Sequence, residues 1–278
     1  MDAENAETLV SEVNIPGKHI LGDAKVTENA TVAGNATVYG DAVVSGGAEV
    51  FGNAHASGNA KVFGKAEVFG NAVVTGRAEV SDRAMVSGNA KVMDNAKVYG
   101  YATVSDNAVV YGNAHVYGYA TVAGNAKVYG DAQVSGEAEV WGDAEVNGSA
   151  KVFVNAEVYG RAQVSGDAEV YGNAVVSGGA EVFGNAHVNG NAEVFGKAKV
   201  SGDATVSGDA EVFGRAGVYG NACVWGNAVV SGEAEVYGNA CVWGNANISG
   251  DAVILGGTWN GSEGPITSGK WKSPGVPG

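Results

Sequence analysis

The chain has 278 residues, 45 of which are glycine, and alanine and valine supply most of its 45% hydrophobic content. Its formal net charge of −14 argues against general nucleic-acid binding, which needs a basic surface, but agrees with a basic partner, with cations or with mimicry of a nucleic acid. No apolar stretch approaches the about 18 residues of a membrane helix, and the first residues, MDAENAETLVSEV, lack the features of a signal peptide. We therefore expect a cytoplasmic protein that does not enter a membrane.

A six-residue repeat fills most of the chain. From Ile20 to Ile254 the sequence consists of 40 consecutive units of the form V-[YFWS]-G-[ND]-A-x, without insertion or deletion. The first slot is Val in all but four units, the fifth is Ala in every unit from Ala24 to Ala252, and the third is nearly always Gly. A strict short period is typical of a solenoid and argues against the disorder that a glycine-rich composition would otherwise suggest.

The order of residue types within each unit predicts its local structure. Alternation places Ala and Val on one face of a short strand and the second and sixth slots on the opposite face. Gly and Asn tolerate positive φ, so the Gly-Asn pair is expected to turn the chain between strands. Because only small residues point inward, we predict an all-β, single-stranded parallel β-solenoid with a narrow core. Stacked Asn side chains at the corners should form ladders along its axis.

The period of six, with an aliphatic residue followed four positions later by a small one, resembles the hexapeptide-repeat superfamily over residues 20–259. The motif GNAxVxGNA is most similar to that of transferases of the YdcK type, a branch named by analogy. The resemblance implies a left-handed triangular β-helix with three units per coil. The chain departs from the family pattern after the aliphatic residue, where Tyr, Phe, Trp or Ser is frequent. General rules favour right-handed crossovers, so a right-handed solenoid of the bactofilin type stays open.

Residues 221–246 indicate the coil length from within the chain. The octet NACVWGNA occurs twice there, and its two copies start three repeat units apart, at Asn221 and Asn239. Three units per coil make Cys223 and Cys241 vertical neighbours and divide the array into about 13 coils with a length of about 64 Å. Parallel side chains on neighbouring strands should hold the two Cβ atoms too far apart for a disulfide, so we expect free thiols.

Three segments are expected along the chain. Residues 20–259 form the β-helix, residues 1–19 an N-terminal cap segment, and residues 260–278 a C-terminal cap or tail. Caps are expected because an open solenoid end exposes unpaired strand edges and would polymerise.

Candidate catalytic groups are few. Hexapeptide-repeat acyltransferases commonly use a histidine at a cleft between subunits, so the resemblance draws attention to His55, His115 and His187, which all occupy the outward sixth slot. No extruded loop interrupts a coil to wall a pocket, and the histidine spacings do not bring three ligands to one metal ion. We therefore predict no catalytic residue, no metal site and no cofactor.

One face carries a sharper pattern. Reading the sixth slot in every third unit gives six glutamates in three vertical pairs, and the second slot of the same strands carries aromatic residues. We predict that this face docks a basic partner or an identical chain, although copying of AEVF and AEVY modules during repeat expansion would give the same pattern. The predicted docking residues are Glu49, Phe51, Glu67, Phe69, Glu139, Trp141, Glu157, Tyr159, Glu193, Phe195, Glu211 and Phe213.

The leading functional hypothesis is a non-enzymatic rigid β-solenoid that acts as a structural or protein-binding module through its outward ladders. Its partner is expected to be another protein or an identical chain, with a homotrimer as one form of self-association, and no direct nucleic-acid binding is expected. Three alternatives stay open: an acyltransferase-like enzyme, implied by the resemblance alone, an acidic nucleic-acid mimic, and a bactofilin-like filament protein. Lysines at positions 25, 61, 97 and 151 on another face weaken the mimic hypothesis.

Overall fold

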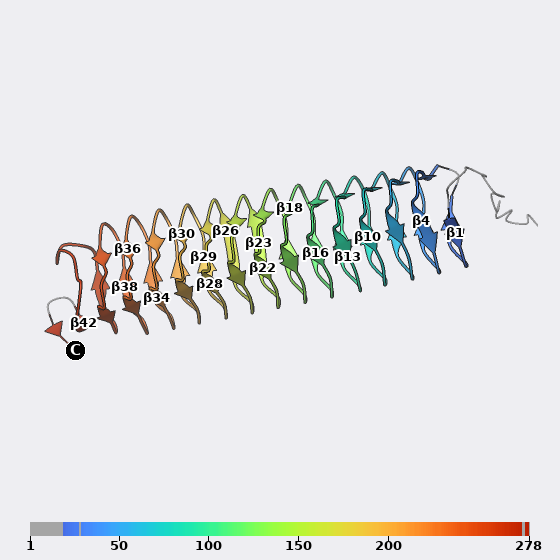
Figure 1. Cartoon of the computed structure of the whole chain (residues 1–278). Coiled ribbons are helices and arrows are strands. Elements are labelled where there is room, and N and C mark those ends of the chain that lie inside the picture. Colours follow the sequence, from blue (N-terminus) through green and yellow to red (C-terminus); the bar gives the residue numbers. More distant parts are fainter. Residues whose placement is uncertain (1–18, 28, 274–275, 278) are drawn as a thin grey trace, which may run out of the picture.

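The computed structural model describes residues 19–27, 29–273 and 276–277. These residues form one elongated rod of stacked coils (Figure 1). Strands begin every six residues through the array, and each pairs in parallel with the third strand further along the chain, as His19–Leu21 does with Thr37–Tyr39. The predicted all-β parallel solenoid with 18-residue coils is therefore confirmed. The left-handed winding implied by the resemblance stays a prediction.

Each coil contributes one short strand to each of three sheets, which we call sheets A, B and C. The strands of sheet A, in spatial order, are β1 (His19–Leu21), β4 (Thr37–Tyr39), β7 (His55–Ala56), β10 (Val73–Val74), β13 (Lys91–Val92), β16 (Val109–Val110), β19 (Lys127–Val128), β22 (Glu145–Val146), β25 (Gln163–Val164), β28 (Glu181–Val182), β31 (Lys199–Val200), β34 (Gly217–Val218), β37 (Glu235–Val236), β40 (Val253–Ile254), β42 (Lys270–Ser273) and β43 (Val276–Pro277). The last strand differs from the others, because β43 runs antiparallel to β42.

Sheet B follows sheet A along each coil. Its strands, in spatial order, are β2 (Lys25–Val26), β5 (Val43–Val44), β8 (Lys61–Val62), β11 (Glu79–Val80), β14 (Lys97–Val98), β17 (His115–Val116), β20 (Gln133–Val134), β23 (Lys151–Val154), β26 (Glu169–Gly172), β29 (His187–Val188), β32 (Thr205–Val206), β35 (Cys223–Val224), β38 (Cys241–Val242) and β41 (Thr258–Trp259). Since one strand belongs to each turn, this 14-stranded sheet gives about 14 turns in the described part of the chain.

Sheet C completes each coil and carries the predicted docking residues. Its strands, in spatial order, are β3 (Thr31–Val32), β6 (Glu49–Val50), β9 (Glu67–Val68), β12 (Met85–Val86), β15 (Thr103–Val104), β18 (Thr121–Val122), β21 (Glu139–Val140), β24 (Glu157–Val158), β27 (Val175–Val176), β30 (Glu193–Val194), β33 (Glu211–Val212), β36 (Val229–Val230) and β39 (Asn247–Ile248). A parallel bridge between Ile248 and Ile266 extends it by one turn.

The core is one column of small apolar side chains. The first-slot valines from Val38 to Val242 and the fifth-slot alanines from Ala36 to Ala240 are fully buried, and Ile248, Ile254 and Trp259 continue the column toward the C-terminal end. The narrow cross-section predicted from the repeat follows, since no larger side chain enters the column before Ile248. Burial of one Val side chain stabilises a fold by only about 1.5 kcal/mol, so the number of stacked coils compensates for the small residues.

A positive φ at the third slot turns the chain at each corner. Glycine supplies it in most coils, for example with a φ of 74° at Gly52. The fourth-slot Asn does not share this conformation, because no asparagine is among the described non-glycine residues with positive φ. The expectation that Asn tolerates the turn through its own φ is therefore wrong, since one left-handed residue per corner suffices. In the described part of the chain, the non-glycine residues with positive φ are Asp82, Asp94, Asp106 and Val154.

The fourth-slot asparagines instead form the predicted ladders. On the corner between sheets C and A, each side-chain amide donates a hydrogen bond to the side-chain oxygen at the same slot of the next coil, at 2.9–3.1 Å, from Asn35 to Asp143. Backbone bonds run the same way, as when the Asn53 N–H donates to the Gly70 carbonyl at 2.7 Å. Side chains and backbone therefore hold successive coils in one register.

Residues 258–273 form a further, less regular turn. Thr258 pairs with Cys241, and Lys270 pairs with Val253, so each offset is shorter by one position than the offset between regular coils. The predicted N-terminal cap of residues 1–19 lies outside the described residues except for His19. Within the described ranges we find no helix with the length and hydrophobicity needed to cross a membrane.

Candidate docking face

The six predicted docking glutamates lie on sheet C in three in-register pairs. Glu49 is opposite Glu67 on neighbouring strands, and the same relationship joins the other two pairs. The valine that follows each glutamate is fully buried, so the alternation within a strand directs the glutamate side chain outward. The spacing read from the sequence therefore places these carboxylates on one side of the rod, one coil apart within each pair.

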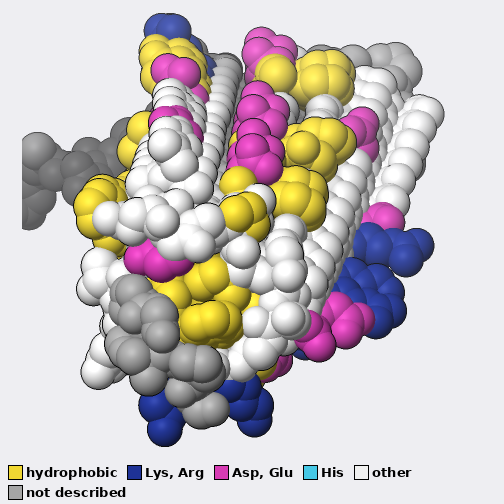
Figure 2. Space-filling model, turned by 90° about the vertical axis from the view of Figure 1, so that its left-hand side faces the viewer, with side chains coloured by type: hydrophobic (Ala, Val, Ile, Leu, Met, Phe, Trp, Pro, Cys, Tyr) yellow, Lys and Arg dark blue, Asp and Glu magenta, His cyan; other side chains and the backbone are white. Residues whose placement is uncertain are grey.

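Aromatic rings stack beside each glutamate pair. The ring centroids of Phe51 and Phe69 are 4.9 Å apart, those of Trp141 and Tyr159 4.4 Å, and those of Phe195 and Phe213 4.8 Å, with interplanar angles of 3°, 7° and 6°. Figure 2, a view of the C-terminal end of the rod, shows acidic and hydrophobic side chains in neighbouring rows along one side. All twelve predicted residues therefore belong to three clusters, each made of two carboxylates and two stacked rings.

Stacked aromatic pairs are not restricted to sheet C. Tyr99 stacks on Tyr117 and Trp225 on Trp243 on sheet B, at 5.0 Å in both cases. Any in-register aromatic pair one coil apart reaches this distance, because it matches the spacing of parallel strands. Stacking alone therefore does not distinguish the docking face from the rest of the rod.

The lack of ion pairs does set the docking glutamates apart from most glutamates of sheets A and B, although four basic residues occupy corner positions two residues from docking residues: Lys65, Arg161, Lys197 and Arg215. The second and sixth slots of the sheet C strands contain no Lys or Arg, and none of the ion pairs among the described residues includes a docking glutamate. On sheets A and B, by contrast, four glutamates form ion pairs with lysines of adjacent coils. These four are Glu79, Glu145, Glu169 and Glu181.

The lysine partners on sheet B change the titration of Glu79. The carboxylate oxygens of Glu79 lie 3.2 Å from Lys61 Nζ and 3.5 Å from Lys97 Nζ. Burial opposes ionisation of Glu79, but the hydrogen bonds and positive charges of the two lysines outweigh it and leave the pKa of this carboxyl lowered. In the same way, the hydrogen bond to Glu169 raises the pKa of Lys151. Both sheet B glutamates, Glu79 and Glu169, are therefore neutralised by lysines of the same sheet.

The histidines singled out from the sequence lie apart from one another. His115 and His187 are both on sheet B, four coils apart as expected, whereas His55 is on sheet A. His115 packs edge-on against Tyr99 at 6.1 Å, and its pKa is lowered by burial and by the charge of Lys97. Nδ1 of His187 lies 3.6 Å from a carboxylate oxygen of Glu169. No group of three or more potential metal ligands comes together in the described part of the chain.

The two cysteines form a disulfide, so the prediction of free thiols is wrong. Cys223 and Cys241 are in-register neighbours, as the octet predicted, with a Cα–Cα distance of 4.7 Å. That distance lies inside the range that disulfides accept. The prediction treated the two side chains as fixed parallel vectors, whereas rotation about χ1 turns the two sulfur atoms toward each other along the axis.

A column of fourth-slot residues was not predicted, although it is visible in the sequence when that slot is read in every third unit. On the corner between sheets B and C, the guanidinium of Arg83 lies over the ring of Tyr101 at 5.4 Å, and Tyr101 stacks on Tyr119 at 4.8 Å. Lys65, Arg83 and Tyr101 help to line a shallow surface hollow of about 410 Å³. The positive charge of Arg83 is therefore directed toward an aromatic face rather than toward a docking glutamate.

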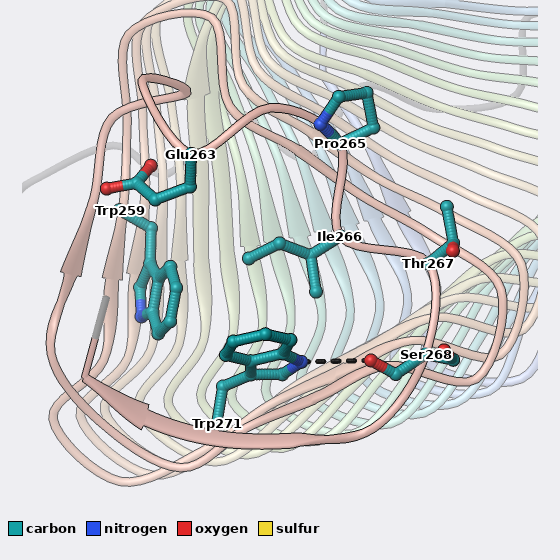
Figure 3. A pocket seen from close by; sticks show the side chains of 7 residues that line it. All are labelled: Trp259, Glu263, Pro265, Ile266, Thr267, Ser268 and Trp271. Atoms are coloured by element: carbon teal, nitrogen blue, oxygen red, sulfur yellow. Dashed lines mark hydrogen bonds between the residues drawn. The ribbon is translucent and has the colours of Figure 1, made fainter. Parts of the chain in front are cut away.

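A second cavity, of about 400 Å³, lies at the C-terminal end of the rod. Figure 3 shows Trp259, Ile266 and Trp271 turned toward one another across the last turn. The indole N–H of Trp259 donates to the Gly256 carbonyl at 2.8 Å, and that of Trp271 to the Ser268 carbonyl at 2.9 Å. Because both donors are occupied, the rings present only apolar surface to this cavity.

Two segments of the chain, residues 30–46 and 162–178, match the family model described as YdcK Beta solenoid repeat. Both segments consist of regular coil, the first spanning β3 to β5 and the second β25 to β27. The comparison with curated proteins finds no match. These two matches, together with the parallel solenoid, confirm the resemblance to the YdcK type that the GNAxVxGNA motif suggested.

Proposed function

We propose that this β-solenoid is a rigid protein-binding rod whose sheet C side docks a cationic segment of a partner protein. The supporting observation is the contrast in counter-charge between the sheets. The docking glutamates form no ion pair within the described residues, whereas four glutamates of sheets A and B pair with lysines of this chain. Carboxylates that the chain itself does not neutralise are available to a cation from outside.

Like charges one coil apart make such a cation favourable. Glu139 and Glu157 are directly opposite on parallel strands, where like charges are mildly destabilising. A Lys or Arg side chain placed between the two carboxylates removes that repulsion and adds two charge-assisted hydrogen bonds. The same arrangement occurs at the other two pairs, so the face offers three equivalent sites along the axis.

The stacked rings add an apolar contact surface to the negative charge of each glutamate pair. Trp141 is 40% exposed although it stacks on Tyr159, so part of its ring is available to a partner. Aromatic rings attract guanidinium and ammonium groups and are frequent among the residues that dominate protein interfaces. An arginine-rich segment can contact the rings and the carboxylates together, because the planar guanidinium group both stacks on aromatic rings and forms bidentate hydrogen bonds with carboxylates.

The fold holds these sites in place before a partner arrives. The valines under the docking residues are fully buried, and each strand is paired on both sides through most of the array. Binding therefore requires little ordering of this chain, which removes part of the entropic cost of association. A net charge of −14 disfavours a second copy as the partner, because two such chains repel each other. Self-association, including a homotrimer, is the competing proposal.

The cytoplasmic location expected from the sequence also stays a proposal. The Cys223–Cys241 disulfide argues against it, since disulfides persist mainly in oxidising compartments. Fractionation of the native host, followed by mass spectrometry of alkylated cysteines, would determine both the compartment and the redox state. Free thiols in a cytoplasmic fraction would support the original expectation.

Binding of a defined cationic probe tests the docking proposal. The probe is a fluorescent 20-residue peptide of alternating arginine and serine, measured by anisotropy at several salt concentrations. The variant Glu139→Lys/Glu157→Lys should weaken binding by about tenfold or more, because it reverses both charges of one site. Light scattering of the free protein reports self-association independently.

A matched variant separates docking from overall charge. Glu181→Lys/Glu235→Lys makes the same change in net charge on sheet A and should alter affinity by less than about threefold. Equal losses in both variants would show that the peptide senses only the charge of the whole rod, and the proposal would be wrong. Removal of the rings in Trp141→Ala/Tyr159→Ala should weaken binding while leaving its salt dependence unchanged.

A further inference from the structure

The two cysteines of the chain join successive coils by the one disulfide that its composition allows. Cys223 begins β35 and Cys241 begins β38, and the two strands pair in register. Both side chains occupy the outward slot of sheet B and are half-buried. The disulfide therefore runs along the rod axis on a surface that solvent and small reductants reach.

This disulfide lies where the regular array ends. The strand of Cys241 is also the strand to which the last turn attaches, because β41 pairs with β38. The Trp243 N–H donates to the Trp259 carbonyl at 2.7 Å, which ties the last turn to the same coil. The covalent bond thus connects the coil that carries the last turn to the coil before it.

The last strand of sheet B at this end, β41, is paired on one side only within the described residues, whereas the strands in the middle of the rod are paired on both sides. A solenoid coil contacts only its neighbours, so a terminal coil is paired on one side and opens first. Two hydrogen bonds near the end are longer than their counterparts on the same corner in the middle of the rod. The side-chain bond from Asn227 to Asn245 is 3.3 Å, compared with 3.1 Å from Asn155 to Asn173. The backbone bond from Asp251 to Thr267 is 3.2 Å, compared with 2.7 Å from Asp143 to Gly160.

A covalent bond across one coil opposes such opening. It closes a loop with a sequence separation of 18, and the coil of Cys241 cannot leave its neighbour while the bond is intact. On the chain-entropy account, closing a loop of this size shifts the opening equilibrium by about a hundredfold. The bond therefore acts on the coil to which the irregular last turn attaches.

We infer that the Cys223–Cys241 disulfide is a redox-sensitive staple of the C-terminal end: its reduction loosens residues 221–273 while the rest of the rod stays folded. The reductant is a dithiol. Its first thiolate attacks one sulfur of the staple to form a mixed disulfide, and its second thiol displaces the remaining cysteine. The cysteine pair gains two electrons and two protons, and the dithiol becomes a disulfide. Exchange with an oxidised dithiol restores the staple.

Hydrogen exchange of the full chain with and without dithiothreitol tests the inference. Peptides from residues 221–273 should exchange about tenfold or more faster after reduction, and peptides from residues 60–200 should not change. Trp225, Trp243, Trp259 and Trp271 lie in the loosened region, so their fluorescence should shift in parallel. The variant Cys223→Ser/Cys241→Ser should exchange like the reduced protein and should not respond to dithiothreitol.

An engineered pair controls for position along the rod. His115→Cys/Gln133→Cys, made in the background without native cysteines, places a disulfide on sheet B between coils that lie several coils from either end of the rod. Its reduction should leave exchange unchanged, because neighbouring coils hold the middle of the rod. The inference is overturned if reduction of the native pair leaves residues 221–273 unaffected, if it unfolds the whole rod, or if the cysteines remain thiols under oxidising conditions.

Discussion

Val154 lies in register with Gly172 on the neighbouring coil and holds a φ of 66° at a corner position that most coils fill with glycine. A β-branched residue in the left-handed region is strained, because its side chain crowds the adjacent carbonyl. The repeat imposes the conformation on the residue, since both neighbouring coils fix the path of the backbone at this corner.

We predict that Val154→Gly stabilises the protein by about 1 kcal/mol, because glycine adopts the required φ without steric cost. Val154 is 45% exposed, so its removal loses little buried apolar surface. Urea unfolding followed by circular dichroism measures the change. Asp94→Gly is the control and should gain less, since the Asp94 carboxylate accepts a hydrogen bond from the Gly112 N–H at 3.1 Å. A lower midpoint for Val154→Gly would contradict the strain argument.

Two adjacent glycines allow a direct test of corner packing. Gly178 has a φ of 69°, and a Cβ placed on it would lie 3.0 Å from backbone N and O of Gly196. Gly178→Ala should therefore destabilise the rod by about 1–3 kcal/mol. Gly179 lacks positive φ, and its Cβ would lie 3.4 Å from the Gly196 carbonyl oxygen, so Gly179→Ala should stay within about 0.5 kcal/mol of the parent. Equal stability of the two variants in thermal unfolding would contradict both the positive φ and the close stacking as constraints on this corner.

The stability lost when an asparagine of the ladder is replaced should increase with the number of side-chain hydrogen bonds that the substitution removes. Asn89 accepts a side-chain hydrogen bond from Asn71 and donates one to Asn107, both at 3.0 Å. Asn89→Ala should cost about 1 kcal/mol, and Asn239→Ala, which removes one bond from Asn221, should cost less. Differential scanning calorimetry of both variants gives the comparison, and a larger loss for Asn239→Ala would refute the ladder as the cause.

The rod should lose stability at alkaline pH. Burial, together with the carboxylate of Glu235, raises the pKa of Tyr237 from 10.0 to about 12. The folded protein then keeps the phenolic proton at pH values where the unfolded chain has released it, so the stabilisation is complete below pH 10 and is lost between pH 10 and 12. Burial also raises the pKa of Tyr99, Tyr129 and Tyr219.

Thermal unfolding between pH 9 and 12 measures this dependence. Tyr237→Phe should flatten the decline, because phenylalanine cannot ionise. An absorbance titration of the phenolates should show an apparent pKa above 10 for the native protein and near 10 in denaturant. An identical decline in the parent and the variant would mean that other groups cause the alkaline loss.

Much of the docking face could be predicted because it depends on register alone. Glu193 and Glu211 are three repeat units apart, and a parallel solenoid without insertions places such residues opposite each other. The asparagine ladders follow from the same arithmetic. The register does not determine how flexible side chains orient, however. For that reason the cation–π contact of Arg83 with Tyr101 and the Cys223–Cys241 disulfide were not predicted.

The repeat by itself determined the all-β class, the 18-residue coil, the buried Val–Ala column and the outward slots, because alternation and period are local properties of the chain. Tertiary structure alone decided which charges are neutralised. Carboxylate oxygens of Glu79 and Glu169 lie 2.8–3.5 Å from lysine Nζ atoms of adjacent coils, whereas no docking glutamate of sheet C is in an ion pair within the described residues. Ion pairing depends on distances of a few ångströms between flexible side chain ends, and stacking of the coils sets those distances.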